Sequence, residues 1–86
     1  MGARLVYSRH AAQMLSERNI RPEWVERTIS APASVEEDPI RPDTKRAFLP
    51  IQENGNRVLR VVYVEGQDTV RVVTAFFDRS RSGMAR

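Results

Sequence analysis

The spacing of apolar residues divides the chain into a helical first part and a strand-forming second part. Between residues 9 and 30, apolar residues recur at intervals of three and four, which is the period of helices with one buried face. From residue 45 onward, turn residues separate runs in which alternate side chains share one polarity, which is typical of strands in a sheet. The pattern predicts an α+β fold: a short strand, two helices, and then an antiparallel sheet of three to four strands.

The first predicted elements are a strand over residues 4–7 and a helix over about residues 9–18. Ser8 precedes the helix as an N-cap, because its hydroxyl can accept a hydrogen bond from an amide of the first turn. Asn19 suits the left-handed backbone position at which helices commonly end. The helix would bury one stripe of side chains, which consists of Ala11, Met14, Leu15 and Arg18.

A second helix is predicted to begin at Pro22, since proline suits the first helical position, where an N–H would lack a partner in any case. It ends at about residues 30–31, because Pro32 disfavours helical geometry in the residue before it. Its inner stripe consists of Val25, Thr28 and Ile29, with Trp24 at the edge. Only a few residues separate the helices, so we expect them to pack as antiparallel or steeply crossed neighbours.

An acidic connection over residues 33–43 leads to the sheet, with a short extended piece near residues 34–36. Asn54-Gly55 and Gly66-Gln67 are typical of tight turns between antiparallel strands. These turns divide the remaining chain into three predicted strands, at about residues 45–52, 57–65 and 69–78. We expect these strands to form the sheet that the helices cover.

The lengths of the turns determine which side chains share a face of this sheet. A two-residue turn at Gly66-Gln67 places Arg60 and Arg71 together on the face that points away from the helices. The opposite face would meet the helices, and it consists of Leu59, Val61, Tyr63, Val70, Val72, Thr74 and Phe76. Polarity favours this register, because a three-residue loop would mix the two kinds of side chain.

The register of the first hairpin remains open between two alternatives. A strict two-residue turn at Asn54-Gly55 pairs Val61 with Phe48 and sends Lys45 outward. A three-residue loop reverses the faces and sends Arg46 and Phe48 outward instead. Either Lys45 or Arg46 therefore joins the outer face.

Composition limits what this domain can do. The 86 residues predict one α+β domain over residues 1–78 and a flexible basic tail over residues 79–86. The absence of cysteine excludes disulfides and thiolate chemistry. No run resembles a signal peptide or a membrane span, so we expect a cytoplasmic protein without membrane contacts. Thirteen of the fourteen basic residues are arginine and the formal charge is +3, which fits an anion-binding surface or a general preference for arginine.

A set of short motifs resembles a known bacterial family. The motifs are Ser8-x-His10-Ala11, Arg18-x-Ile20, Pro22-Glu23-x-Val25, Pro32, and the strand segments Arg60–Tyr63 and Val72–Thr74. Over roughly residues 5–77 they resemble a small bacterial domain of unknown function, DUF4258, in which glycine usually stands where this chain has Asn19. The helical corner is also similar to BrnT-type toxins and, through them, to the RelE/ParE superfamily. The resemblance implies a BrnT/RelE-like fold whose outer sheet face contacts RNA or protein partners, among them a cognate antitoxin.

Cleavage of RNA without a metal requires a base for the 2′-hydroxyl, an acid for the leaving oxygen, and cations that stabilise the phosphate. His10 is the candidate base, because the chain has one imidazole and this group exchanges protons near neutral pH. Arg60 and Arg71 are the candidate phosphate clamp. Supporting contacts with RNA or another anion are assigned to Lys45, Arg46, Arg79 and Arg81. The structural alternatives are a histidine that ties a helix to the sheet and arginines that only face solvent.

Two functions are compatible with these residues. The leading hypothesis is a toxin-like RNA-binding protein, and specifically a metal-independent endoribonuclease, under the control of a protein partner. The alternative is a non-catalytic protein-interaction module that uses the sheet edge or the arginine face. A single histidine without clustered ligands predicts no metal site, and no motif indicates a cofactor. Glu23 and Glu26 disfavour a DNA-recognition role for the second helix, and the oligomeric state stays open.

Overall fold

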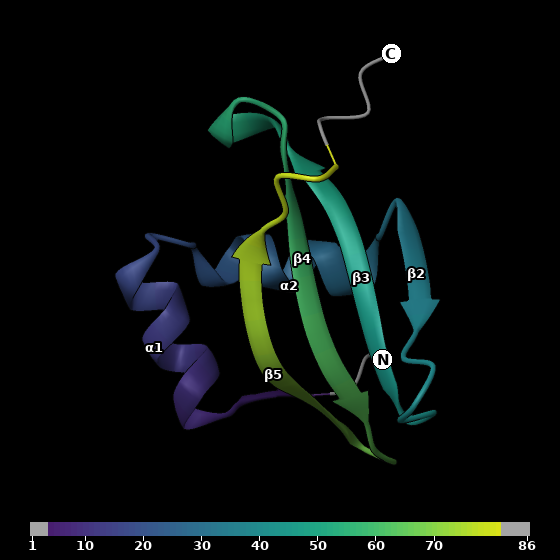
Figure 1. The fold of residues 1–86 in the computed structure, drawn as a ribbon. Helices are drawn as coiled ribbons and strands as arrows, with labels where there is room; N and C mark the ends of the chain where they lie inside the picture. Colours follow the sequence, from purple (N-terminus) through teal and green to yellow (C-terminus); the bar gives the residue numbers. More distant parts are fainter. Residues whose placement is uncertain (1–3, 82–86) are drawn as a thin grey trace.

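The structure, a computed structural model, describes residues 4–81 and consists of one sheet with two helices on one of its faces (Figure 1). The elements in chain order are β1 (Arg4–Tyr7), α1 (Arg9–Glu17), α2 (Pro22–Ser30), β2 (Ser34–Glu37), β3 (Thr44–Ile51), the short 3-10 helix η1 (Gln52–Asn54), β4 (Arg57–Glu65) and β5 (Thr69–Phe77). Below, the face that the helices cover is the inner face, and the opposite one is the outer face.

The strands within residues 4–81 form a five-stranded mixed sheet in the order β1-β5-β4-β3-β2. β1 runs parallel to β5, and the other neighbours are antiparallel. The α+β class is confirmed, but the predicted antiparallel sheet of three to four strands is too small. The short extended piece predicted near residues 34–36 pairs with β3 as a complete edge strand, and β1 adds a parallel pair. Both β2 and β1 join the sheet by pairing with strands elsewhere in the sequence, and the local alternation of side chains cannot predict such pairing.

The corner between the helices forms as its sequence predicts. The hydroxyl of Ser8 accepts a hydrogen bond from the Ala11 N–H at 3.0 Å and donates one to the Val73 carbonyl at 3.1 Å. Asn19 takes the left-handed conformation with φ of 55°, and α2 begins at Pro22. The start of α1 is therefore fixed on β5, while the turn that follows α1 sets the direction of α2.

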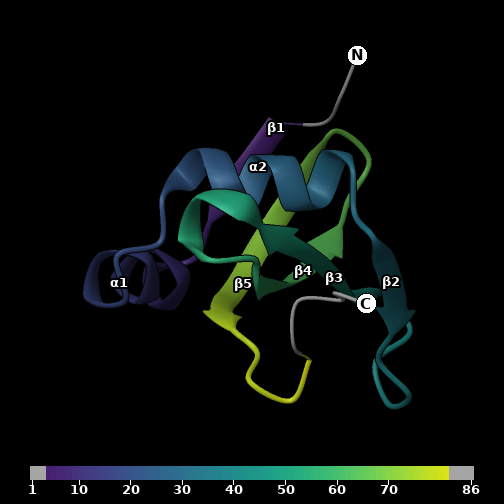
Figure 2. The ribbon, with the colours of Figure 1, turned by 90° about the horizontal axis from the view of Figure 1, so that it is seen from above.

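The main core lies between the helices and the inner face of the sheet. α1 packs against β5 and β1, and α2 packs across β4 and β3, as Figure 2 shows from above. The buried cluster consists of Ala11, Leu15, Ile20, Trp24, Val25, Ala47, Ile51, Leu59, Val61, Tyr63, Val70, Val72 and Ala75. Burial of this apolar surface is the main favourable contribution to folding.

The second hairpin differs from its prediction in two ways. Its two-residue turn is Gln67-Asp68, where the Gly66 N–H donates to the Thr69 carbonyl at 2.8 Å. A register shift then follows on β5, since Tyr63 pairs with Val72 but Val62 pairs with Thr74. This β-bulge inserts one extra residue and reverses the faces beyond it.

Because of the bulge, the prediction that Thr74 and Phe76 face the helices is wrong. Phe76 lies opposite Arg60 on the outer face, whereas Phe77 faces inward and its ring meets that of Trp24 edge-on at 6.1 Å. Strict alternation would place Phe76 on the inner face and Phe77 on the outer face. The one inserted residue exchanges the faces of these two rings.

The first hairpin has the face assignment of the three-residue alternative. Phe48 pairs with Arg60, so that Arg46 and Phe48 lie on the outer face and Ala47 on the inner face. The connection is longer than either alternative, because η1 is followed by Gly55 and Asn56 in left-handed conformations, with φ of 68° and 61°. Arg46 is therefore the residue that joins Arg60 on the outer face.

Candidate functional site

An arginine between two aromatic rings forms the centre of the outer face. The Cζ atom of Arg60 lies 5.7 Å from the ring centroid of Phe48 and 5.1 Å from that of Phe76. The three residues come from adjacent strands, because β4 runs between β3 and β5. A guanidinium over aromatic faces gains cation–π attraction. This cluster fixes one cationic group on the face opposite the helices.

Residues 78–81, here called the C-terminal strap, cross the outer face immediately after β5 (Figures 1 and 2). The carboxylate of Asp78 accepts hydrogen bonds from the Ser80 hydroxyl at 2.6 Å, the Ser80 N–H at 2.9 Å and Nη1 of Arg60 at 3.2 Å. The Ser80 hydroxyl is the main reason why the pKa of Asp78 lies below its usual value, and Arg60 adds to the effect. Asp78 also joins the strap to β4 through its N–H, which donates to the Val58 carbonyl.

Arg81 closes the strap at its far end. Its guanidinium lies over the ring of Phe48, with Cζ at 3.7 Å from the centroid, and forms an ion pair with Glu36 of β2. Phe48 lies under this guanidinium and is only 2 % exposed, although it lies on the face without helices. Val58, on the same face, is also 2 % exposed, and its carbonyl accepts a hydrogen bond from the Asp78 N–H. The Nε atom of Arg60 is buried there and has no hydrogen-bond partner among residues 4–81.

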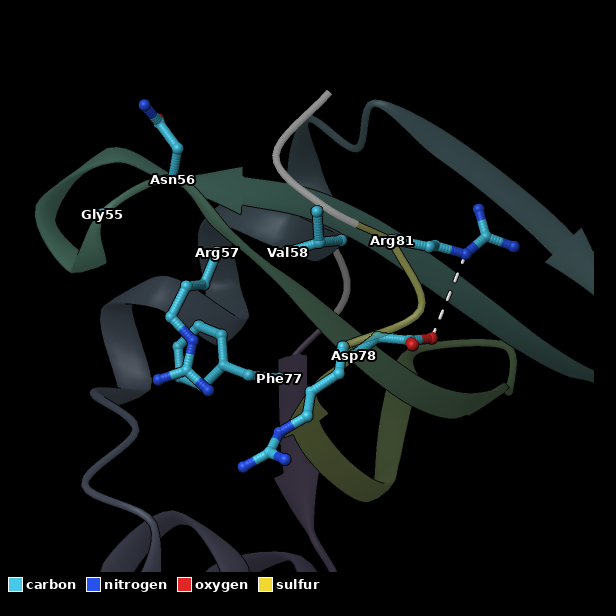
Figure 3. A pocket seen from close by; sticks show the side chains of 8 residues that line it. Gly55, Asn56, Arg57, Val58, Phe77, Asp78 and Arg81 are labelled. Carbon is cyan, nitrogen blue, oxygen red and sulfur yellow. Dashed lines mark ion pairs between the residues drawn. The ribbon is translucent and has the colours of Figure 1, made fainter. Parts of the chain in front are cut away.

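A cleft of about 370 Å³ lies where the strap leaves β5, and we call it the arginine cleft. Its lining consists of Gly55, Asn56, Arg57, Val58, Phe77, Asp78, Arg79 and Arg81. Figure 3 shows the Arg57 side chain over the ring of Phe77 on one side and the pair of Arg81 and Asp78 on the other. The Cζ atom of Arg57 lies 5.1 Å from the Phe77 centroid, so that the ring positions this guanidinium.

The arginines of the cleft, and Arg60 next to it on the outer face, differ in whether an acid neutralises them. Arg60 and Arg81 pair with Asp78 and Glu36, respectively. Arg57 and Arg79 are exposed, and no ion pair within residues 4–81 includes either of them. A guanidinium offers a planar fork of donors that matches phosphate oxygens. The cleft therefore presents two cations that remain available to an anion.

The candidate catalytic residues lie apart in the structure. His10 is exposed in the first turn of α1, which is joined to β5 at Val72 and Val73 through Ser8. Arg71 is exposed on the outer face of β5, opposite Val6 and Val64, and Arg60 is engaged by Asp78. Within residues 4–81, no hydrogen bond or ion pair joins His10 to either arginine.

The four supporting cations have different surroundings. Nζ of Lys45 pairs with Glu65 at 2.7 Å, which raises the pKa of this lysine. Arg46 lies 3.7 Å from Glu36 and 3.6 Å from Asp38. Arg79 and Arg81 both line the arginine cleft. These two belong to the predicted basic tail, of which residues 82–86 lie outside the described residues.

The sequence pattern does not identify Arg57 as a site residue. It directly follows the turn of the first hairpin, and its position over Phe77 depends on the bulge that turns Phe77 inward. The only available signal was its place next to Asn54-Gly55, at the same end of the sheet as the end of β5. The contact between Arg57 and Phe77 cannot be inferred from the sequence unless the register of β5 is known.

Residues 4–81 hold neither a cluster of metal ligands nor a helix that could span a membrane. No group of three or more histidine, aspartate or glutamate side chains there is arranged to hold a metal ion. In the same part of the chain, none of the helices has the length and apolar character needed to cross a membrane.

Comparison with known proteins identifies a family. A family model described as a domain of unknown function (DUF4258) matches residues 7–77, which include both helices and all strands except the first residues of β1. No match is found among curated proteins or among solved structures. The match covers the start of the arginine cleft but ends before Asp78.

Proposed function

The chain belongs to the DUF4258 family, and we propose that it is a toxin-like protein that binds RNA through the arginine cleft and the outer face of β5. The observation that carries this proposal is that Arg57 and Arg79 line one cleft and have no acidic partner within residues 4–81. The resemblance of the helical corner to BrnT and RelE-type toxins supports RNA as the anion and a cognate antitoxin as the controlling partner.

The outer face offers further phosphate contacts beyond the cleft. Arg71 lies on β5 six residues before Phe77, the last residue of this strand, which corresponds to about 20 Å of extended strand, and Arg79 follows in the C-terminal strap. Arg4, on the neighbouring β1, is exposed two residues before Val6, the partner of Arg71. A single strand of RNA that follows β5 would therefore meet cations at both ends, with the ring of Phe76 partly exposed between them.

The double substitution Arg57→Ala/Arg79→Ala tests this proposal. We expect it to weaken binding of a short fluorescein-labelled single-stranded RNA and to reduce the slope of log affinity against log salt concentration. The slope should fall by about 1.4, because each phosphate contact with a single strand contributes about 0.7. Fluorescence anisotropy at several salt concentrations measures both quantities.

The matched control is Arg18→Ala/Arg41→Ala, which removes the same charge from two exposed arginines outside the cleft. Its salt slope should change much less than that of the cleft variant. Equal losses in the two variants would mean that only the net charge attracts RNA, and the cleft would have no role. Thermal unfolding of each variant verifies that the fold is intact.

Cleavage of RNA is the catalytic part of the proposal, and His10 is the residue that would carry it. We expect expression of the wild-type protein in a bacterial host to slow growth and fragment RNA, and His10→Ala to lower the cleavage rate by about 10²–10⁴-fold. His10 is exposed and makes no side-chain hydrogen bond within residues 4–81, so this variant should fold normally. If the wild type and His10→Ala leave RNA equally intact, the protein is no ribonuclease, although it can still bind RNA.

A further inference from the structure

The strand β2 ends the sheet with a free backbone edge. The Asp38 N–H donates to the Thr44 carbonyl at 2.9 Å, which continues the antiparallel register in which Glu36 pairs with Arg46. Since hydrogen-bonding direction alternates along an antiparallel ladder, the N–H and C=O groups of Val35 and Glu37 point away from β3. No strand within residues 4–81 pairs with them.

Two exposed aliphatic side chains accompany this edge. Val35 is 45 % exposed, and Ile40, in the turn after β2, is 84 % exposed. The turn is ordered by the Asp38 carboxylate, which accepts hydrogen bonds from the N–H groups of Ile40 and Arg41 at 2.8 and 3.0 Å. An isoleucine held in this way adds nothing to the core, so its position has no folding explanation.

The charge around the edge is opposite to that of the whole chain. Residues 34–43 contain four acidic residues and one arginine, whereas the formal charge of the chain is +3. Arg46 and Arg81 engage Glu36 and hold β2 from the outer face. Glu37 is exposed and takes part in no ion pair within residues 4–81. Arginines thus hold β2 in place on the outer face, whereas on the inner face Glu37 keeps its negative charge unpaired within residues 4–81.

We propose that the edge of β2 is the docking site for an extended basic segment of a partner protein, which adds to the sheet as a sixth strand. Backbone groups of Val35 and Glu37 would form the ladder, as in other cases of strand addition. A cationic side chain of the segment faces Glu37, and an aliphatic one packs on Val35 and Ile40. A second copy of the chain fits less well, since its own β2 would bring acidic residues together.

Because Val35 and Glu37 lie two residues apart on one face of β2, the proposal is tested on the full chain with two labelled peptides, in which the residues on the facing side alternate between valine and lysine in one and between valine and glutamate in the other. We expect only the lysine peptide to bind in fluorescence anisotropy. It should slow the hydrogen exchange of the Val35 and Glu37 amides, because these would become paired. Failure of the lysine peptide to bind, or binding without protection of these amides, overturns the proposal.

Three variants locate the contact. Val35→Pro removes an edge donor but no hydrogen bond to β3, because this N–H points away from the sheet. It should abolish peptide binding and leave thermal unfolding nearly unchanged. Glu37→Lys should weaken binding about tenfold, a change of about 1.4 kcal/mol, whereas the control Glu23→Lys on α2 should not. Unaltered binding by Val35→Pro contradicts the proposed ladder.

Two further measurements separate the alternatives. Sedimentation of the free protein reports self-association, and a dimer that Val35→Pro dissociates would identify a second copy as the occupant and overturn the proposal. RNA binding should be the same in Val35→Pro and wild type, because the arginine cleft does not include β2. The docking site and the RNA site can thus fail independently.

Discussion

Replacement of Asp78 by alanine should lower the free energy of unfolding by about 2–3 kcal/mol. The side chain of Asp78 is only 8 % exposed and accepts three hydrogen bonds, two from Ser80 and one from Arg60. Its removal leaves the partly buried guanidinium of Arg60 between two rings without an acid, and a charge that has lost its partner while it stays partly desolvated destabilises the fold. Urea unfolding of the two proteins measures the difference.

The effect of Asp78 should also depend on pH. Because Ser80 and Arg60 hold the pKa of Asp78 below its usual value, the carboxylate is a stronger acid in the folded chain than in the unfolded chain. Its stabilising contribution is then complete above the unfolded pKa of about 4 and is lost as the pH falls through the lower folded pKa. The stability difference between wild type and Asp78→Ala should therefore shrink below about pH 4.

Two comparisons identify the cause of this effect. Asp68→Ala removes an exposed acid from the β4–β5 turn, and we expect it to change stability by less than about 0.5 kcal/mol. Arg60→Met in the Asp78→Ala background should recover part of the loss, since methionine fills the space between the rings without a charge. Equal destabilisation by Asp68→Ala and Asp78→Ala would show that the strap does not depend on this carboxylate.

The helix starts and ends of the helical corner are predictable from the sequence, because each depends on a few adjacent residues. Ser8 as a cap, Asn19 as a left-handed stop and Pro22 as a helix start need no knowledge of the sheet. The bulge on β5 and the edge strand β2 depend instead on which distant strands pair. Alternation along one strand cannot reveal an inserted residue, so it assigns Thr74 and Phe76 to the wrong face of the sheet.

The same limit applies to the candidate site. The sequence indicated an outer arginine face, and Arg79 and Arg81 do line the arginine cleft. It could not indicate that Asp78 engages Arg60, because this contact requires the chain to turn back across the sheet after β5. A count of arginines along the sequence therefore overestimates how many are free to bind an anion. Only the ion pairs of the folded chain show that Arg60 is neutralised by Asp78, whereas Arg57 and Arg79 have no acidic partner within residues 4–81.

Phe77→Ala should both destabilise the fold, by about 2–3 kcal/mol, and weaken RNA binding. The ring packs against Trp24 on the inner face and carries the guanidinium of Arg57 at 5.1 Å. Its loss opens a cavity beside Trp24 and removes the surface that positions Arg57 in the cleft. Phe77→Leu should keep most of the stability, because the volume is largely filled, but it cannot replace the cation–π contact.

The comparison of Phe77→Leu with Phe76→Leu distinguishes the bulged register from strict alternation. With the bulge, Phe77→Leu loosens Arg57, whereas Phe76→Leu removes a ring from beside Arg60 and leaves Trp24 untouched. Trp24 fluorescence should therefore respond to the Phe77 substitution alone. A response to Phe76→Leu instead would place that ring on the inner face, and the contact that positions Arg57 in the arginine cleft would then be absent.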